Sequence, residues 1–482
     1  MIKQAMTMSG RELTMAAVIL VLTGCASGPD YVRPEVALPG QWSAVSSTST
    51  TDGTTNGATN QAAALPDWRG YFTDARLQAL IGQALEHNRD LRIATARIGE
   101  ARAQYGISRA ERLPDVELLA KREASLTPAD LSSLGRQLNA QRYDVGVELL
   151  SYELDFWGRV NRLNEAALAS YLSSEEAQRA FRLSLIADVA NAYFSQCELQ
   201  EKVQLARAVA DNRREFRDLA EQRRQAGLIN SMDFLKADAA SEAARIDLAN
   251  SEQNLAAANH WLQLLSGDLL SDGAALPPAR DLGAQDLAPV AANLPAEVLL
   301  RRPDVLAAEQ RLIAANASIG AARAAFLPRI SLTGALSTAS GSLSHLFKAG
   351  SRAWIFKPQL RLPLFDNGRN EGNVDLAEAR QNIAVAEYEK TIQQSFREVA
   401  DLLSAREHLD AQLHAQEATQ RIQSERLALM EARYKAQISH FLDVLDARRD
   451  LLIAQQGVLQ ARRMVLSNAA QLYKALGGGK ET

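Results

Sequence analysis

The chain has 482 residues, of which 47% are hydrophobic and 23% charged, and its formal net charge is -4 at pH 7. This composition suits a folded protein with more than one structural region and lacks the basic excess of a nucleic-acid-binding protein. The two cysteines, Cys25 and Cys197, and the six histidines without ligand spacing argue against a metal centre. We therefore expect no metal centre and no nucleic-acid partner.

The first 24 residues have the pattern of an export signal. Basic residues precede an apolar run at residues 15–22 that is too short to cross a bilayer. The run ends in Leu22-Thr23-Gly24-Cys25, which resembles a bacterial lipobox, in which the cysteine thiol is acylated before the chain is cleaved ahead of it. Cys25 is the predicted lipidation site. The alternative is an ordinary signal peptide that contains a cysteine.

The segment after Cys25 is predicted to be extended. Residues 46–61 form a Ser, Thr, Gly and Asn tract without apolar periodicity, which is typical of a tether. No later stretch approaches the ~18 to 20 apolar residues that a membrane helix needs. A membrane protein without such helices is either held only by lipid or crosses the membrane as a β-barrel.

Helical patterns dominate the rest of the chain. One begins near Asp74 and continues to Arg112, and two very long segments, 159–226 and 373–456, contain neither Gly nor Pro. The long segments are rich in Ala, Leu, Glu, Gln and Arg, which favour helices. A straight helix of the first segment's length would reach roughly 100 Å. Such length indicates coiled-coil packing or several helices in series.

Four shorter segments between the helices alternate between apolar and polar residues. They are residues 116–121, 143–149, 329–337 and 353–364. This alternation is typical of transmembrane barrel strands, although a soluble sheet with one wet face predicts the same pattern. The aromatic residues that could form interfacial girdles are Tyr152, Phe156, Trp157, Trp354 and Phe356.

The chain also repeats itself. The segment around Asp233 matches the segment around Asp443, and Gly158-Arg159 matches Gly368-Arg369 at the same offset of 210 residues. A Leu-Pro pair precedes the strands in both halves. The order helix, two strands, long helix, turn, helix is therefore duplicated, and the aligned Leu-Pro and Gly-Arg pairs argue against chance similarity between Ala-rich helices.

The number of predicted strands limits how the chain could form a barrel. Four strands cannot enclose a water-filled lumen, because the diameter of a barrel grows with its strand number. Open sheet edges are not tolerated in lipid. If the strands cross a membrane, several chains must share one barrel. Three chains would supply twelve strands, and the repeat would give their helices pseudo-sixfold symmetry.

The chain resembles the outer-membrane efflux channels of the TolC/NodT type, in particular the lipoprotein branch that serves resistance-nodulation-division pumps. The resemblance covers almost the whole mature chain. Its matching stretches are Gly28-Pro29-Asp30-Tyr31, residues 152–159, Arg301-Arg302-Pro303-Asp304, residues 319–328 and residues 473–479. It implies an α+β membrane protein that forms a homotrimer. A twelve-stranded barrel, with four strands from each chain, would cross the outer membrane. A long helical coiled-coil barrel would continue into the periplasm, surrounded by an equatorial domain.

This resemblance suggests a division of the chain. The parts are a signal peptide at 1–24, a lipidated extended or equatorial segment at 25–73, a first repeat at 74–266, an equatorial linker at 267–294, a second repeat at 295–477 and a tail at 478–482.

The implied function is that of a passive exit duct. A periplasmic adaptor and an inner-membrane resistance-nodulation-division pump would deliver drugs to it, and it would conduct them to the exterior without a cofactor. Common catalytic motifs are absent from the sequence, so we expect no enzyme. The alternatives are an exit duct for type I protein secretion and a lipid-anchored coiled-coil scaffold without a pore.

The family closes its periplasmic end with rings of acidic and bulky side chains at the tip of the second long hairpin. The matching positions here are Leu442, Asp443 and Asp446. Residues three apart share one face of a helix, so three copies would form rings of carboxylates that favour cations. The alternative is that both aspartates lie on an ordinary solvated helix face.

The chain also departs from the family pattern. The first hairpin has Lys236 where the second has Asp446, and Gln437 replaces the turn glycine that Gly227 supplies in the first hairpin. Ser439 stands where a TolC-type channel has an arginine that helps to lock the closed state. Any latch in this chain must therefore use other partners.

Overall fold

The computed structural model describes residues 28–35, 66–267, 281–285, 287–288 and 296–479. Cys25 and the tract at 46–61 lie outside these residues. The chain divides into two compact units. The strand unit contains residues 28–35, 97–175 and 307–389, and the hairpin unit contains the remaining described residues. Within the described ranges, no helix is both long and apolar enough to cross a membrane.

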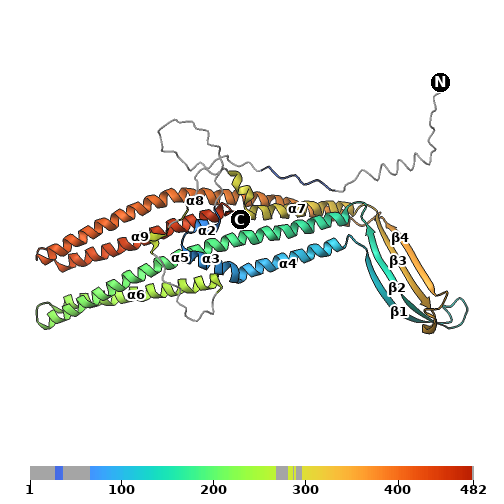
Figure 1. Ribbon diagram of the computed structural model, residues 1–482, viewed down its shortest axis with the longest axis horizontal. Helices are drawn as coiled ribbons and strands as arrows, with labels where there is room; N and C mark the ends of the chain where they lie inside the picture. The colour runs from blue at the N-terminus through green and yellow to red at the C-terminus, as the bar shows by residue number, and fades with distance from the viewer. Residues whose placement is uncertain (1–27, 36–65, 268–280, 286, 289–295, 480–482) are drawn as a thin grey trace, which may run out of the picture. The chain divides into compact units, whose positions relative to one another are not determined.

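The strand unit contains one four-stranded antiparallel sheet. Its strands are β1 (Asp115–Thr127), β2 (Leu138–Leu154), β3 (Arg329–Ser340) and β4 (Arg352–Arg361), in the order β1-β2-β3-β4 (Figure 1). The four predicted strands are confirmed, but β4 ends at Arg361 rather than at residue 364. Arg361 pairs with Arg329, the first residue of β3, so β4 has no partner residues on β3 beyond it.

The register of the sheet separates an apolar face from a polar face. One row of paired residues runs Leu118, Val147, Leu336 and Trp354 across the four strands. The neighbouring row begins with Leu119 on β1 and contains Gly146, Ser337 and Ala353. A bulge between Leu149 and Tyr152 keeps the remaining apolar residues of β2 on the apolar face.

Eight α-helices accompany the sheet in the described part of the chain. They are α2 (Trp68–Tyr71), α3 (Ala75–His87), α4 (Arg89–Ala110), α5 (Arg159–Gln225), α6 (Ser231–Ser266), α7 (Pro303–Ala324), α8 (Arg369–Lys435) and α9 (Phe441–Ala475). Short 3-10 turns are η1 (Leu282–Ala284), η2 (Ala296–Arg301) and η3 (Leu343–His345). Helices α5 and α8 have 67 residues each, so the two very long helices are confirmed.

The elements occur twice in the same order. Helix α4, strands β1 and β2, and helices α5 and α6 are followed by α7, β3, β4, α8 and α9. In the hairpin unit, α6 runs back along α5 and α9 runs back along α8 (Figure 1). This order is the one that the internal repeat predicts. The boundaries of the two repeats remain a prediction, since the two compact units each take residues from both halves.

The core of the hairpin unit gathers around α2, α3 and the end of α9. The rings of Tyr71 and Tyr473 stack at 4.6 Å, and Phe72 packs edge-on against Tyr71. Full burial of one large apolar side chain contributes about 1.5 to 3 kcal/mol. Cys197 is buried in the same cluster, and burial raises the pKa of its thiol to about 12. This cysteine is therefore a core residue, because a thiol with so high a pKa is hardly ionised near neutral pH.

An N-terminal strap, residues 28–35, packs on α7 in the strand unit. Arg33 and the Tyr31 hydroxyl both donate to the carboxylate of Glu309, with Arg33 Nε 2.7 Å and Tyr31 Oη 3.1 Å from Oε1. A side chain on Gly28 would lie 2.6 Å from the Cα atom of Gly320, so only glycine permits this approach. The strap, which begins three residues after Cys25, is therefore held in a defined position on α7.

Candidate functional site

The two hairpins of the hairpin unit end in turns of the same geometry. Gly227 adopts a φ of 72° in the first turn and Gln437 a φ of 59° in the second. In the first turn, the N–H of Leu228 donates to the carbonyl of Arg223 at 2.8 Å. In the second turn, the N–H of Ile438 donates to the carbonyl of Arg433 at 2.9 Å. A left-handed backbone costs a residue with a side chain about 1 to 2 kcal/mol. The second turn thus has the same left-handed backbone as the first, but a glutamine adopts it in place of a glycine and is therefore strained.

Asp443 lies in the first turn of α9, directly after this strained turn. The backbone N–H of His440 donates to its carboxylate at 3.0 Å, so Asp443 satisfies a free amide at the start of the helix. The negative charge also suits the positive end of the helix dipole. Sequence reasoning missed this capping role, although an acidic residue three positions after a helix boundary is a recognisable signal for it.

The predicted aperture residues lie close together on one helical turn. Asp443 and Asp446 are both exposed, whereas Val444 and Ala447 between and beyond them are buried. Asp446 Oδ1 lies 3.6 Å from Arg449 Nη1 at an exposed position. The backbone of Leu442 belongs to the same turn of α9, but its side chain lies outside the described part of the structure. Both carboxylates therefore face away from the packed side of the hairpin.

A polar link joins the two hairpins near these aspartates. Arg448 on α9 donates to Glu431 on α8 at 2.8 Å and to the side chain of Asn212 on α5. Burial, and then the nearby positive charge of Arg448, lower the pKa of Arg213. No local pattern could have paired Asn212 with Arg448, because they are 236 residues apart. This link supplies the contact between hairpins for which the sequence named no residue.

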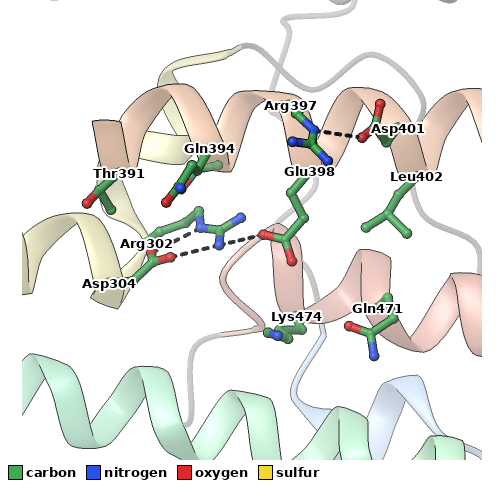
Figure 2. A pocket seen from close by; sticks show the side chains of 11 residues that line it. Arg302, Asp304, Thr391, Gln394, Arg397, Glu398, Asp401, Leu402, Gln471 and Lys474 are labelled. Atoms are coloured by element: carbon green, nitrogen blue, oxygen red, sulfur yellow. Dashed lines mark hydrogen bonds and ion pairs between the residues drawn. The ribbon is translucent and has the colours of Figure 1, made fainter. Parts of the chain in front are cut away.

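A second polar cluster lies around Arg302 in the hairpin unit and lines a pocket of about 570 Å³ (Figure 2). The buried guanidinium donates to the Ala475 carbonyl at 2.6 Å, and to the carboxylates of Asp304 and Glu398 at 2.8 Å each. Burial opposes the charge, but the two carboxylates outweigh it, so the net shift raises the pKa of Arg302. Arg302 joins α7, α8 and the end of α9. Each of the three guanidinium nitrogens donates a hydrogen bond, which indicates that Arg302 has a structural role.

Comparison with known families decides the identity of the chain. The sequence profile described as outer membrane efflux protein matches residues 80–268 and 294–478, and thus covers both halves of the repeat. The chain belongs to the outer membrane efflux protein family. As a member, it is a transport component of the outer membrane that extends into the periplasm, and it is not an enzyme.

Characterised relatives resemble this efflux protein over nearly its whole length. Outer membrane protein OprJ of Pseudomonas aeruginosa is 42% identical, over 96% of this chain and 94% of the relative. The cation efflux system protein CusC of Escherichia coli O157:H7 is 40% identical, over 98% of this chain and 99% of the relative. The probable efflux pump outer membrane protein TtgC of Pseudomonas putida is 38% identical, over 97% and 95%.

Solved structures match the fold of this efflux protein closely. A membrane protein from Pseudomonas aeruginosa, 40% identical, has a TM-score of 0.85 and shares 94% of this chain and 98% of its own. The open state of the Neisseria gonorrhoeae MtrE outer membrane channel, 37% identical, has a TM-score of 0.82 with the same two coverages. The α+β fold predicted from the sequence, with its four strands and long helical hairpins, is confirmed.

Proposed function

We propose that three copies of this efflux protein form the outer-membrane exit duct of a tripartite multidrug pump. The observation that carries the proposal is the sheet. Within the described residues, β1 and β4 each have one edge without a partner strand. Lipid does not tolerate such edges, and pairing between copies removes them. Three copies supply twelve strands and a lumen wide enough for solutes, in keeping with the growth of barrel diameter with strand number.

The proposed partners are an inner-membrane resistance-nodulation-division pump and a periplasmic adaptor. They supply the energy and the cargo, and the duct conducts passively. Several relatives are named as components of efflux pumps or efflux systems, which supports this partnership. Acylation at Cys25 would anchor each copy in addition to its strands. Mass spectrometry of the mature protein tests this anchor, and an unmodified N-terminus at another residue would disprove it.

The proposed resting state is closed at the hairpin tips by Leu442, Asp443 and Asp446. Three carboxylates around one axis repel each other, so closure needs packing, bound cations or partial protonation. The hydrogen bond from Arg448 to Asn212 on α5 would hold the second hairpin against the first, and the one to Glu431 would position the Arg448 side chain for it. Contact with the pump and adaptor would break this link and let the repelling tips move apart.

Multidrug cargo is favoured by the lipoprotein-type motifs, but a relative named for cations is 40% identical to this chain, whereas those named for antibiotic and toluene efflux are 38% identical. A deletion strain tested against antibiotics, organic solvents and metal salts separates these cargoes. We expect increased susceptibility to several unrelated drugs, restored by the wild-type gene. Sensitivity to metal salts alone would make the protein a cation duct. Loss of a secreted protein without any change in susceptibility would indicate type I secretion.

A further inference from the structure

We propose that Arg122 and Arg352 form a binding site for the phosphate groups of the acylated glycolipid in the outer leaflet of the membrane. This inference rests on the proposed trimeric barrel. Arg122 lies on β1 and Arg352 on β4, the two edge strands of the sheet, and both side chains are exposed. When β4 of one copy lies beside β1 of the next, the two arginines flank the same seam.

Both arginines lie on the apolar face of the sheet. Arg352 shares a row of paired residues with Thr338, Val145 and Ala120, and Arg122 pairs with Tyr143 in the next row toward the loops. The adjacent row on the other side is Leu118, Val147, Leu336 and Trp354. A cation on a face that is otherwise apolar needs an anionic partner or an interface, because charge is costly in hydrocarbon.

The position of these rows fits the outer interface. The four helix-connected strand ends lie at one end of the sheet, and the loops 128–137 and 341–351 lie at the other (Figure 1). From the row of Ile330 to the row of Ser340, the strand rises about 33 Å, or roughly 25 Å along a normal to the membrane at a tilt of about 40°. Outer-membrane barrels have an apolar band about 25 Å tall. With the helices in the periplasm, Arg122 and Arg352 therefore lie at its outer edge.

Charge pairing distinguishes the two faces at this height. On the polar face, Lys121 lies 3.5 Å from Glu123, and Arg142 binds Asp144 at 2.8 Å. Throughout the described part of the chain, Arg122 and Arg352 form no ion pair with a carboxylate. Arg122 only stacks over the ring of Tyr143, at 5.6 Å from its centroid. At this height, Lys121 and Arg142 on the polar face are paired internally, whereas Arg122 and Arg352 on the lipid face are available for an external anion.

The chemistry of the ligand follows from its neighbours. Guanidinium groups form strong paired hydrogen bonds with phosphate oxygens. Below them on the same face, Trp354, Phe356 and Leu118 are 75%, 64% and 79% exposed. A ligand that contacts both the guanidinium groups and the apolar side chains below them carries phosphate on a head group and acyl chains beneath it. That combination describes the phosphorylated glycolipid of the outer leaflet and does not describe free phosphate.

The test measures lipid A retained by trimers purified from outer membranes, with Arg122→Gln/Arg352→Gln compared with wild type. Loss of charge-assisted hydrogen bonds should lower the retained lipid A at least about tenfold. The matched control is Lys121→Gln, at the same height on the polar face, which should retain the wild-type amount. Arg122→Lys/Arg352→Lys keeps the charge and should retain more lipid A than the glutamine variant. Should the double glutamine variant fail to assemble, Arg352→Gln alone is measured in its place.

Equal retention by the glutamine variant and the wild type, or an equal loss in Lys121→Gln, would overturn the site. Rebinding of added lipid A distinguishes the sources of phosphate. Bis-phosphorylated lipid A should bind, dephosphorylated lipid A should not, and excess inorganic phosphate should not displace it. Displacement by inorganic phosphate, or equal binding of phosphatidylglycerol vesicles, would overturn the glycolipid assignment. Native mass spectrometry of the same samples separates the two proposals, since only the absence of wild-type trimers contradicts the duct.

Discussion

Single residues at the hairpin tips combine structural and proposed functional roles. Asp443 caps α9 through its hydrogen bond from His440 N, and its exposure also leaves the carboxylate available to a pore axis. Asp446 has only an exposed ion pair at 3.6 Å, which contributes little to stability. A substitution at Asp443 therefore changes the cap and the charge together, and one at Asp446 changes mainly the charge.

Neutralising both aspartates should lower the cation selectivity of the channel and weaken its block by multivalent cations. Asparagine preserves an acceptor for the His440 N–H, so the change in Asp443→Asn/Asp446→Asn is largely one of charge. Single-channel recording in planar bilayers measures both properties. Asp233→Asn, at the equivalent position of the first hairpin, is the control and should behave as wild type. Unchanged selectivity and block in the double variant would show that these residues do not line the constriction.

Replacement of Gln437 by glycine should stabilise the second turn. Glycine removes the left-handed strain of about 1 to 2 kcal/mol, and its greater freedom in the unfolded chain offsets part of the gain. We expect a net gain of about 1 kcal/mol in local stability, measured as slower amide hydrogen exchange around residues 433–440. Gly227→Gln is the reverse change in the first turn and should speed exchange there. Faster exchange in Gln437→Gly would contradict the strain argument.

Among the elements, the strands and long helices lie close to the segments that the sequence predicts. Helix α5 (Arg159–Gln225) fills the first segment without Gly or Pro, and the repeat located the second turn at Gln437 even though no glycine marks it. The contacts between hairpins could not be predicted. Arg448 is one of many arginines on polar helix faces, and only folding brings Asn212 to it.

Removal of the Arg448 side chain should weaken closure. Arg448→Ala removes the hydrogen bonds to Glu431 and Asn212, each worth about 1.5 to 3 kcal/mol when one partner is charged. We expect a higher resting conductance in single-channel recording. Arg207→Ala is the control, because it removes an exposed pair with Glu252 inside the first hairpin. Asn212→Asp would strengthen the link and should lower conductance. An increase with Asn212→Asp would mean that this link does not favour the closed state.

At the scale of the whole molecule, the two faces of the sheet should differ in their tolerance of charge. Leu332 lies on the apolar face, in the row with Tyr152 and Pro358, and Thr333 lies on the polar face. Lysine on the lipid face costs about 2 to 4 kcal/mol at the bilayer midplane and less toward the interfaces, and Leu332 lies between the inner edge of the apolar band and its middle. Leu332→Lys should therefore reduce assembly, whereas Thr333→Lys should assemble normally, as counted by native mass spectrometry. Equal assembly of both variants, or a stable monomeric pore, would rule out the proposed barrel.

The sequence by itself determined the properties that depend on local periodicity. Helix length, strand alternation, the internal repeat and the family motifs are written in consecutive residues, because side chains repeat every 3.6 residues in a helix and every two in a strand. Only the tertiary structure decided which distant groups meet. It paired Arg448 with Asn212, enclosed Arg302 between Asp304 and Glu398, and placed Arg122 and Arg352 on one face of the sheet, in adjacent rows of paired residues. Such contacts depend on strand register and helix packing, which no single segment of the chain specifies.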